Sequence, residues 1–241
     1  MENKGKFIAI EGGDRVGKST QAELLKQYLI EKGFDVILTR EPGGVSLAEK
    51  IRNLLLDPEE KHIDPLSELF LYEAARVQHM KNVILPALDE NKAVICDRFT
   101  LSTIAYQGAG RGISLELIEN FNKAASFGKF PTLTICIDAD PKKMLKNVPS
   151  TASRKHTIDK ISKSAIDLVP KTQKETANLI KYGSKFDRIE LENLQFHIRA
   201  RKEFLEQARK HPNEIKVVKR QRSIPGTRDK IKKIVDAVLG L

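Results

Sequence analysis

Short apolar segments alternate with longer segments of helical periodicity along most of the chain. Residues 7–11 form the first run of strand-forming side chains, and residues 19–32 place Ala22, Leu25 and Leu29 on one helical face that ends at Gly33. Further strands are predicted at 35–39, 93–96, 132–138 and 215–218, and further helices at 46–56, 65–90, 114–126, 187–210 and 228–239. Pro86 is expected to kink the helix over 65–90. This alternation favours an α/β fold with a parallel sheet covered by helices on both faces.

Residues 146–186 break the regularity, because they are rich in Lys, Ser and Thr and carry few large apolar side chains. We interpret this segment as a mobile insertion within one domain that covers residues 1–241. A parallel sheet binds ligands outside the carboxyl ends of its strands, so the segments that follow the predicted strands are the places to look for a site.

Composition limits the class of protein. The longest apolar runs fall far short of the eighteen or so residues of a membrane span, so we expect a soluble, cytoplasmic protein without a secretory signal. The whole chain has a net charge of +10, but the charge is unevenly spread. Residues 142–241 hold 25 Lys and Arg against 11 Asp and Glu, so the part before them is net negative. This asymmetry is typical of proteins that bind nucleic acid or an anionic small ligand such as ATP, and charge alone does not choose between them.

Two cysteines, Cys96 and Cys136, each lie inside a short apolar segment. Neither has the spacing of a metal-ligand pair, so we expect reduced thiols packed in the core rather than a disulfide or a metal site.

A glycine-rich segment lies between the first predicted strand and the first predicted helix. It matches the phosphate-binding pattern G-x-x-x-x-G-K-[ST], and its residues are Gly12, Gly13, Asp14, Arg15, Val16, Gly17, Lys18, Ser19 and Thr20. Backbone N–H groups of such a loop surround phosphates, and the positive end of the following helix favours the same anion. We therefore expect ATP to bind here, with Lys18 at the β- and γ-phosphates and the Ser19 hydroxyl on Mg²⁺.

Asp97 and Arg98 follow the predicted strand 93–96. A carboxylate there can hold the metal or its water shell, and the guanidinium can grip a phosphate. Taken alone, this pair is more often a solvated turn with a salt bridge, but a phosphate-binding loop upstream reverses that preference.

Several further motifs occur in a fixed order along the chain. They are Thr39-Arg-Glu-Pro-Gly-Gly44, Ala48-Glu-Lys-Ile-Arg52, Tyr72-Glu-Ala-Ala-Arg76, Asp97-Arg-Phe99, Ser102-Thr-Ile-Ala-Tyr-Gln-Gly108 and Asp187-Arg-Ile-Glu190. Together with the glycine-rich loop they resemble the thymidylate kinase family over residues 7–141 and again over 187–208. The resemblance implies a P-loop NTPase-type fold with a helical lid, in-line transfer of a phosphoryl group from ATP to dTMP to give ADP and dTDP, Mg²⁺ as cofactor, and a homodimer formed through the long helices.

The resemblance also implies roles for single residues in binding dTMP. Asp14 matches the carboxylate that faces the 3′-hydroxyl, and Arg52 and Arg98 match the arginines that hold the acceptor phosphate. Tyr72 takes the place of an aromatic ring, usually phenylalanine, that stacks on thymine. The remaining matches are Arg76, Thr103 and Gln107 at the base edge, Tyr106 beneath the sugar where it disfavours a ribose, and Glu41 and Pro42 beside the phosphate.

Asp97 and Glu41 are expected to act on the metal through water. Several of the roles implied by the resemblance have an ordinary structural alternative. Tyr72 and Tyr106 can be half-buried helix aromatics, Arg52 and Arg98 can form surface ion pairs, and the segment from Pro42 can be a simple turn.

Two features depart from the bacterial pattern of the family. Many bacterial relatives have glycine at the position of Arg15 and supply their catalytic arginine from the lid, whereas eukaryotic relatives carry an arginine in the loop. The resemblance therefore implies that Arg15 acts on the γ-phosphate in place of a lid arginine. The predicted catalytic set is therefore Arg15, Lys18, Asp97 and Arg98. The second departure is the lid, which is about thirty residues longer than usual in the family; there Arg154 and Lys155 either close over ATP or belong to a solvated basic face, and we favour the second interpretation.

Two other functions remain open at this point. One is a P-loop kinase of another nucleotide, such as dUMP, or of a nucleoside. The other, more remote, is a P-loop ATPase that binds nucleic acid through the basic half, although the sequence shows no clear base-stacking pattern to support it.

Overall fold

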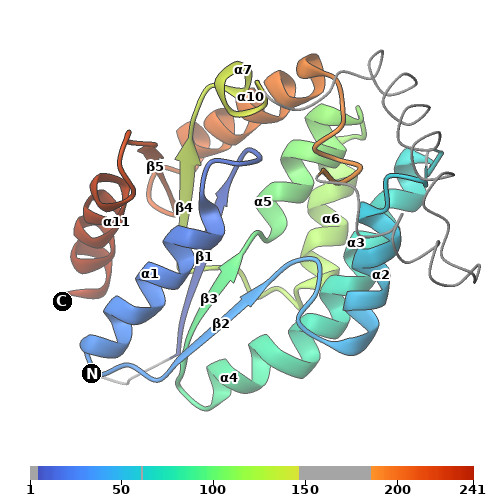
Figure 1. The fold of residues 1–241 in the computed structure, drawn as a ribbon. Helices are drawn as coiled ribbons and strands as arrows, with labels where there is room; N and C mark the ends of the chain where they lie inside the picture. Colours follow the sequence, from blue (N-terminus) through green and yellow to red (C-terminus); the bar gives the residue numbers. More distant parts are fainter. Residues whose placement is uncertain (1–4, 61, 147–185) are drawn as a thin grey trace, which may run out of the picture.

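A single parallel sheet forms the centre of the molecule (Figure 1). The computed structural model describes residues 5–60, 62–146 and 186–241. Its five strands lie in the order β2-β3-β1-β4-β5, and every neighbouring pair is parallel. The strands are β1 (Lys6–Gly12), β2 (Val36–Arg40), β3 (Ala93–Asp97), β4 (Leu133–Asp138) and β5 (Ile215–Lys219). The predicted α/β class and parallel sheet are confirmed, and each strand lies within one residue of its predicted bounds.

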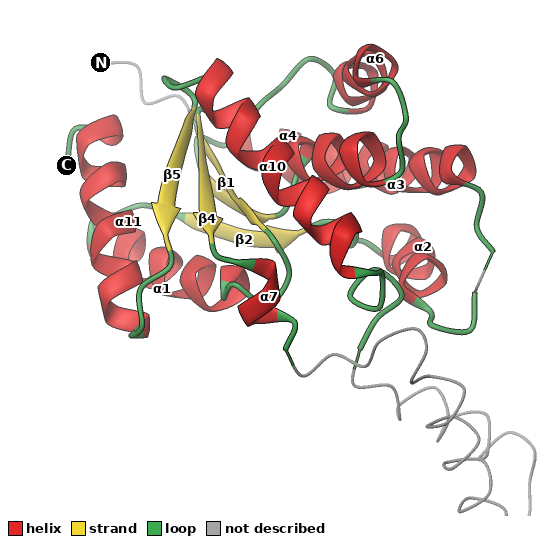
Figure 2. Ribbon diagram, turned by 90° about the horizontal axis from the view of Figure 1, so that it is seen from above, coloured by secondary structure: helices red, strands yellow, loops and turns green. Residues whose placement is uncertain are grey.

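Helices cover both faces of the sheet (Figure 2). On one face, α1 (Lys18–Glu31) and α11 (Ile224–Leu239) pack Leu25, Leu29 and Ile231 against Ile8 and Ile135 of the strands. The other face is covered by three helical stretches that come from separate parts of the chain. Because helices cover both faces, the central strands are buried except for one end residue of each, as is typical of parallel sheets.

The first of these stretches is the predicted helix over 65–90, and it is not uniform. It consists of α3 (Pro65–His79), a π-helical segment η1 (Met80–Ile84) and α4 (Leu85–Asp89). Pro86 has no N–H to donate and its ring crowds the carbonyl four residues earlier, so the wider π turn lies where the regular ladder cannot continue. Met80 and Ile84 pack against Phe7 and Val94 of the sheet.

The second stretch, residues 100–110, was not predicted as a helix. It begins as α5 (Thr100–Thr103) and continues as a π-helical segment η2 (Ile104–Gly110). A π helix does not follow the 3.6-residue period by which helices are recognised in a sequence, and glycines at 108 and 110 weaken the prediction further. Packing favours glycine at 110, since a Cβ there would lie 2.5 Å from the Phe196 ring.

The third stretch is α10 (Leu194–Lys210), and its predicted start at residue 187 is wrong. Asp187 accepts a hydrogen bond from the Glu190 backbone N–H at 2.8 Å, which turns the chain, and Asn193 then caps the helix by accepting from the Phe196 N–H at 3.0 Å. The last helix, α11, begins four residues before its predicted start because Ser223 caps it and Pro225 occupies its first turn.

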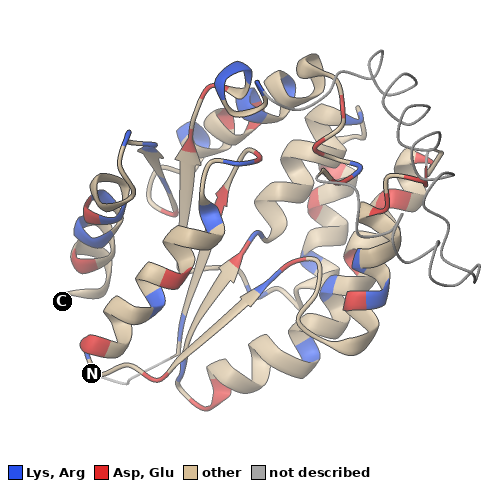
Figure 3. Ribbon diagram, viewed as in Figure 1, with Lys and Arg blue, Asp and Glu red and all other residues tan. Residues whose placement is uncertain are grey.

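Three further helices complete the described fold: α2 (Ser46–Leu56), α6 (Leu115–Ala125) and α7 (Pro141–Met144). Basic residues of the second half of the chain recur on α7, α10 and α11 (Figure 3). Cys96 and Cys136 are buried free thiols, as predicted. The predicted insertion, with Arg154 and Lys155, lies outside the described residues except for its first and last positions. Within the described part of the chain, no helix is both long and apolar enough to span a membrane.

Candidate active site

The glycine-rich loop connects the carboxyl end of β1 to the N-terminus of α1. Gly12 and Gly17 adopt φ values of 131° and 97°, which favour glycine. A Cβ on Gly12 would lie 2.3 Å from the Ile137 carbonyl oxygen, so no other residue fits there. Backbone N–H groups at the start of α1 have no partners within the helix and are free to bind an anion.

Lys18 is the first residue of α1 and is 7% exposed. Its Nζ donates a hydrogen bond to the Gly13 carbonyl oxygen at 2.7 Å. Burial and the nearby Arg98 cation lower the pKa of Lys18 to about 8, although Asp14 and Asp97 act in the opposite direction. The ammonium group is thus held in the loop at a place that favours a bound anion.

Ser19 and Asp97 meet where β3 ends beside β1. The Ser19 hydroxyl donates to Asp97 Oδ2 at 2.5 Å, and Asp97 Oδ1 is a buried oxygen without a hydrogen-bond partner among the described residues. A hydroxyl beside an unpartnered carboxylate oxygen fits Mg²⁺ or its bound water. In the described ranges no group of three or more His, Cys, Asp or Glu is arranged to hold a metal, and Mg²⁺ does not need one because it keeps water and phosphate ligands.

Two cavities open at this edge of the sheet. The first, the phosphate-loop cavity, is lined by residues of the loop together with Arg40, Arg52, Asp97 and Arg98. The second, the Tyr72 cleft, lies between the loop after β2, α3 and the stretch 100–110. All ten residues predicted to bind the acceptor line the Tyr72 cleft: Asp14, Glu41, Pro42, Arg52, Tyr72, Arg76, Arg98, Thr103, Tyr106 and Gln107.

The two cavities share a wall. Asp14, Glu41, Arg52, Arg98 and Asp187 line both of them. A group held in one cavity and a group held in the other therefore meet between the guanidinium groups of Arg52 and Arg98. Two positive charges there favour the approach of two anions.

Arg98 is fixed from several sides. Its backbone is left-handed at φ 69°, and its guanidinium pairs with Asp14 and donates to the Gly12 carbonyl oxygen at 3.3 Å and the Tyr106 hydroxyl at 3.4 Å. Burial would raise the pKa of Asp14, but Arg98, His197 and Lys18 together keep that pKa well below its usual range. Asp14 is therefore an ionised hydrogen-bond acceptor in the wall of the Tyr72 cleft.

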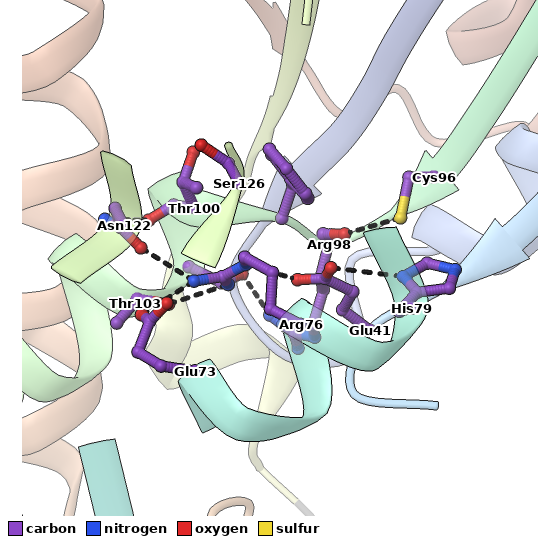
Figure 4. Close-up of polar contacts among 12 residues, drawn as sticks. Glu41, Glu73, Arg76, His79, Cys96, Arg98, Thr100, Thr103, Asn122 and Ser126 are labelled. Atoms are coloured by element: carbon purple, nitrogen blue, oxygen red, sulfur yellow. Dashed lines mark hydrogen bonds and ion pairs between the residues drawn. The ribbon is translucent and has the colours of Figure 1, made fainter. Parts of the chain in front are cut away.

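Arg76 stands at the centre of a buried polar network (Figure 4). Its Nε donates to Glu41 at 2.8 Å, its Nη1 to Glu73 and Asn122 at 2.7 Å each, and its Nη2 to Thr103 at 3.0 Å. These bonds use four of the five N–H donors of a guanidinium, so one N–H on Nη2 remains for the Tyr72 cleft.

Glu41 is held from its other side by His79. The His79 ring is completely buried, with Nδ1 3.1 Å from Glu41 Oε1 and Nε2 2.6 Å from the Thr39 hydroxyl. The backbone of the loop after β2 also packs on this ring, because a Cβ at Gly44 would lie 2.6 Å from His79 Cδ2. His79 therefore connects the end of β2 to α3 and fixes the carboxylate that faces both cavities.

Arg15 lies at the rim of the phosphate-loop cavity. Its Nε is 3.8 Å from Glu190 Oε1, and its guanidinium lies 4.7 Å from the centre of the Phe186 ring. Asp187 and Glu190, which both line this cavity, were part of a quoted motif but received no predicted role.

Two other buried groups were also missed. Glu11 accepts hydrogen bonds from the N–H groups of Phe99 and Ser102 at 2.7 and 3.0 Å, so it holds the chain that follows Arg98. His197 on α10 places Nδ1 3.4 Å from Asp14. Glu11 was visible as a charged residue at the end of an apolar strand, whereas nothing in the sequence indicated the contact of His197.

A phosphate-binding loop that shares a wall with a second cleft, lined by rings, arginines and the Gln107 amide, defines a P-loop kinase that acts on a small phosphorylated acceptor. By class, the chain is a nucleoside monophosphate kinase.

Comparisons with known proteins identify the family. A family model described as thymidylate kinase matches residues 10–184. The chain is 38% identical to a thymidylate kinase from a Geobacillus species over 215 residues, covering 89% of this chain and 88% of the relative. It is 51% identical over 150 residues to one from Finegoldia magna, covering 61% of this chain and 74% of that protein. A crystal structure of thymidylate kinase from Ehrlichia chaffeensis superposes with a TM-score of 0.69 at 31% identity, covering 97% of this chain and 99% of the other. The chain belongs to the thymidylate kinase family, whose reaction converts ATP and dTMP to ADP and dTDP.

Proposed function

We propose that this chain transfers the γ-phosphoryl group of ATP to dTMP across the shared wall of its two cavities. ATP occupies the phosphate-loop cavity and dTMP the Tyr72 cleft. The observation that carries this proposal is the position of Arg52, Arg98 and Asp14 in both cavities at once. In-line transfer needs the two reacting groups to meet there, and most of the catalysis then comes from positioning and electrostatics.

The donor phosphates bind to the backbone of residues 12–20, with Lys18 at the β- and γ-phosphates. Support comes from the glycine geometry of the loop and from the buried ammonium group of Lys18. Ser19 would hold Mg²⁺ directly, and Asp97 and Glu41 would hold its water shell. Bound there, Mg²⁺ supplies positive charge to the phosphate oxygens.

The acceptor phosphate lies between Arg52 and Arg98, and the sugar 3′-hydroxyl donates a hydrogen bond to Asp14. Tyr106 packs beneath the sugar, with its hydroxyl 2.9 Å from Asp14 Oδ2 and its ring against Phe196. In this position the Tyr106 ring would crowd the 2′-hydroxyl of a ribose, so deoxynucleotides are preferred.

Thymine stacks on Tyr72, and its polar edge faces Arg76, Thr103 and Gln107. The free N–H of Arg76 suits the O4 carbonyl of the base. Because Arg76 is buried and already makes four hydrogen bonds, this donor is preorganised and loses little entropy on binding.

Arg15 stabilises the charge that develops on the transferred group. Its side chain lies at the rim of the phosphate-loop cavity, where among the described residues it makes a 3.8 Å ion pair with Glu190 and a ring contact with Phe186. A side chain held this loosely can move onto the γ-phosphate, so the catalytic arginine comes from the loop rather than from residues 146–186.

The protein acts as a cytoplasmic homodimer. Leu47 and Leu54 of α2, Leu66 and Phe70 of α3, and Leu117 of α6 are large apolar side chains that are 39–49% exposed. These helices lie together on one side of the molecule, away from α1 and α11 (Figure 2). Burial of such a face against a second copy is favourable.

A coupled ADP-release assay with ATP and dTMP tests the proposed division of roles. Lys18→Ala should lower kcat/KM at least about a hundredfold, because the loop loses its buried cation. Arg15→Gly should lower kcat by about a thousandfold with little change in the KM of dTMP, as loss of an arginine finger does. Near-normal kcat in Arg15→Gly would return the catalytic arginine to the lid, and a preference for thymidine over dTMP would contradict the roles of Arg52 and Arg98.

A further inference from the structure

Glu68 lies directly behind the wall of the Tyr72 cleft without lining it. It is on α3, one turn before Tyr72, and is completely buried. Its Oε1 accepts from Gln107 Nε2 at 2.7 Å and from Arg111 Nε at 3.1 Å. Its Oε2 accepts from Arg111 Nη2 at 3.0 Å and is 2.6 Å from Arg188 Nη2.

Two guanidinium groups keep this carboxylate ionised. Burial would raise the pKa of Glu68, but the hydrogen bonds and charge of Arg111 and the charge of Arg188 outweigh burial and lower it. An ionised carboxylate only accepts hydrogen bonds. The Gln107 amide must therefore turn its NH₂ group toward Glu68, which leaves its carbonyl oxygen directed elsewhere.

The Gln107 carbonyl oxygen is available to the Tyr72 cleft. Gln107 lines that cleft, and no hydrogen bond to its Oε1 is found among the described residues. In the described ranges, this oxygen is not one of the buried side-chain atoms that lack a hydrogen-bond partner. Among these residues it therefore has no partner and is not buried, so a ligand in the cleft can reach it. The wall of the cleft consequently offers one acceptor from Gln107 beside one donor from Arg76.

We propose that Glu68 determines the base specificity of the enzyme by fixing the orientation of the Gln107 amide. This inference rests on the proposed function, which places Gln107 and Arg76 at the base edge. Glu68 is a positioning residue, since it acts on the substrate only through Gln107.

The fixed pattern matches one class of pyrimidine. Thymine and uracil present an N3–H donor beside the O4 acceptor, which pair with the Gln107 oxygen and the Arg76 N–H. Cytosine presents an N3 acceptor beside an amino group, so both of its groups meet a like partner. A site with fixed buried polar groups rejects such an analogue strongly because those groups are left unpaired.

The experiment compares dTMP, dUMP and dCMP as acceptors with the wild-type enzyme, Glu68→Gln and Arg111→Lys. In Glu68→Gln the side chain at 68 can donate as well as accept, so the Gln107 amide is free to turn. The ratio of kcat/KM for dTMP to that for dCMP should fall at least about tenfold, mainly through a higher KM for dTMP. The ratio for dTMP to dUMP should not change, because both bases have the same polar edge.

Arg111→Lys is the matched control, since it disturbs the same ion-pair cluster without removing the acceptor of Gln107. Its dTMP to dCMP ratio should equal that of the wild type. An unchanged ratio in folded Glu68→Gln overturns the proposal, and so does an equal fall in both variants, which would mark a purely structural role.

If Glu68→Gln does not fold, Glu68→Asp is measured instead, because it keeps the charge but shortens the reach to Gln107. A wild-type enzyme without preference for dTMP over dCMP would contradict the proposed base contacts themselves, before any variant is considered.

Discussion

Lys18 is a buried cation next to another cation, and this makes its proton sensitive to a bound anion. Its pKa of about 8 means that about half of the side chains are neutral at pH 8 when no nucleotide is bound. The phosphates of ATP favour the charged form and raise the pKa. Binding must therefore take up protons at pH 8, whereas at pH 6.5 Lys18 is already protonated and takes up almost none.

Calorimetry of a non-hydrolysable ATP analogue in buffers of different ionisation enthalpy measures this uptake. We expect up to about half a proton per bound nucleotide at pH 8 from Lys18, and close to none at pH 6.5. Lys18→Arg is the control, because a guanidinium does not titrate in this range. Equal proton uptake by Lys18→Arg and the wild type at pH 8 would show that another group is responsible.

Single residues with a strong local reason for their identity were predictable from the sequence. The glycines of residues 12–17 and Lys18 follow from what a backbone must do to surround phosphates, and Asp97 follows from its place at the end of a buried strand. The contacts of Glu11, Glu68, His79 and His197 were not predictable, because their partners lie on elements far away in the sequence. Their roles arise only when the fold brings those elements together.

At the scale of elements, the loop after β2 depends on its contact with α3. Gly44 has φ 86° and a Cβ there would meet His79 at 2.6 Å, whereas Gly33 has φ 87° and no atom within 4 Å. Gly33→Ala isolates the cost of a left-handed alanine, about 1–2 kcal/mol. Gly44→Ala adds a clash with the ring that holds Glu41, so it should lose clearly more stability and also raise the KM for dTMP.

Urea unfolding and acceptor kinetics of the two variants test this prediction together. The KM for dTMP in Gly33→Ala should stay at the wild-type value, since that turn lies at the far end of α1. If Gly44→Ala proved no less stable than Gly33→Ala, with an unchanged KM, His79 would not be the support of this loop.

The boundaries of the helices and strands show which local structures the hydrophobic period of the sequence does not predict. The strands were placed accurately because they are short, apolar and flanked by polar turns. The helix over 100–110 was missed because its π segment does not repeat every 3.6 residues, although it carries Tyr106 and Gln107. The turn at 187–193 was taken as helix because its apolar spacing continues that of α10, while the Asp187 side chain competes for backbone N–H groups and turns the chain.

At the scale of the whole molecule, the arrangement of the site follows from sheet topology. β3 lies between β2 and β1, so the carboxyl ends of these three strands bring together the loop after β2, the phosphate loop and the Asp97-Arg98 pair. The strand pattern alone predicted a common edge, and the family resemblance predicted which residues would meet there. The order of the strands, which decides that the two cavities share a wall, was not readable from the sequence.

The apolar face of α2, α3 and α6 leads to a prediction for the assembled molecule. Phe70 is 47% exposed at this face, although its ring edge also contacts Phe121 of α6 at 5.2 Å between centroids. A charge at position 70 would have to be buried without a partner in a dimer, which costs several kcal/mol for each copy. Phe70→Glu should therefore be a monomer of 27.1 kDa by light scattering at concentrations where the wild type has twice that mass.

Val238→Glu is the matched control, because Val238 is an exposed apolar residue of α11 on the opposite side of the molecule. It should keep the mass of the wild type. A Phe70→Glu protein that stays dimeric would place the interface elsewhere, and a wild-type protein of 27.1 kDa under all conditions would remove the proposed dimer. The Tyr72 cleft is built from residues of one chain, so a folded monomer should keep its dTMP site, and its KM for dTMP should separate loss of assembly from loss of the site.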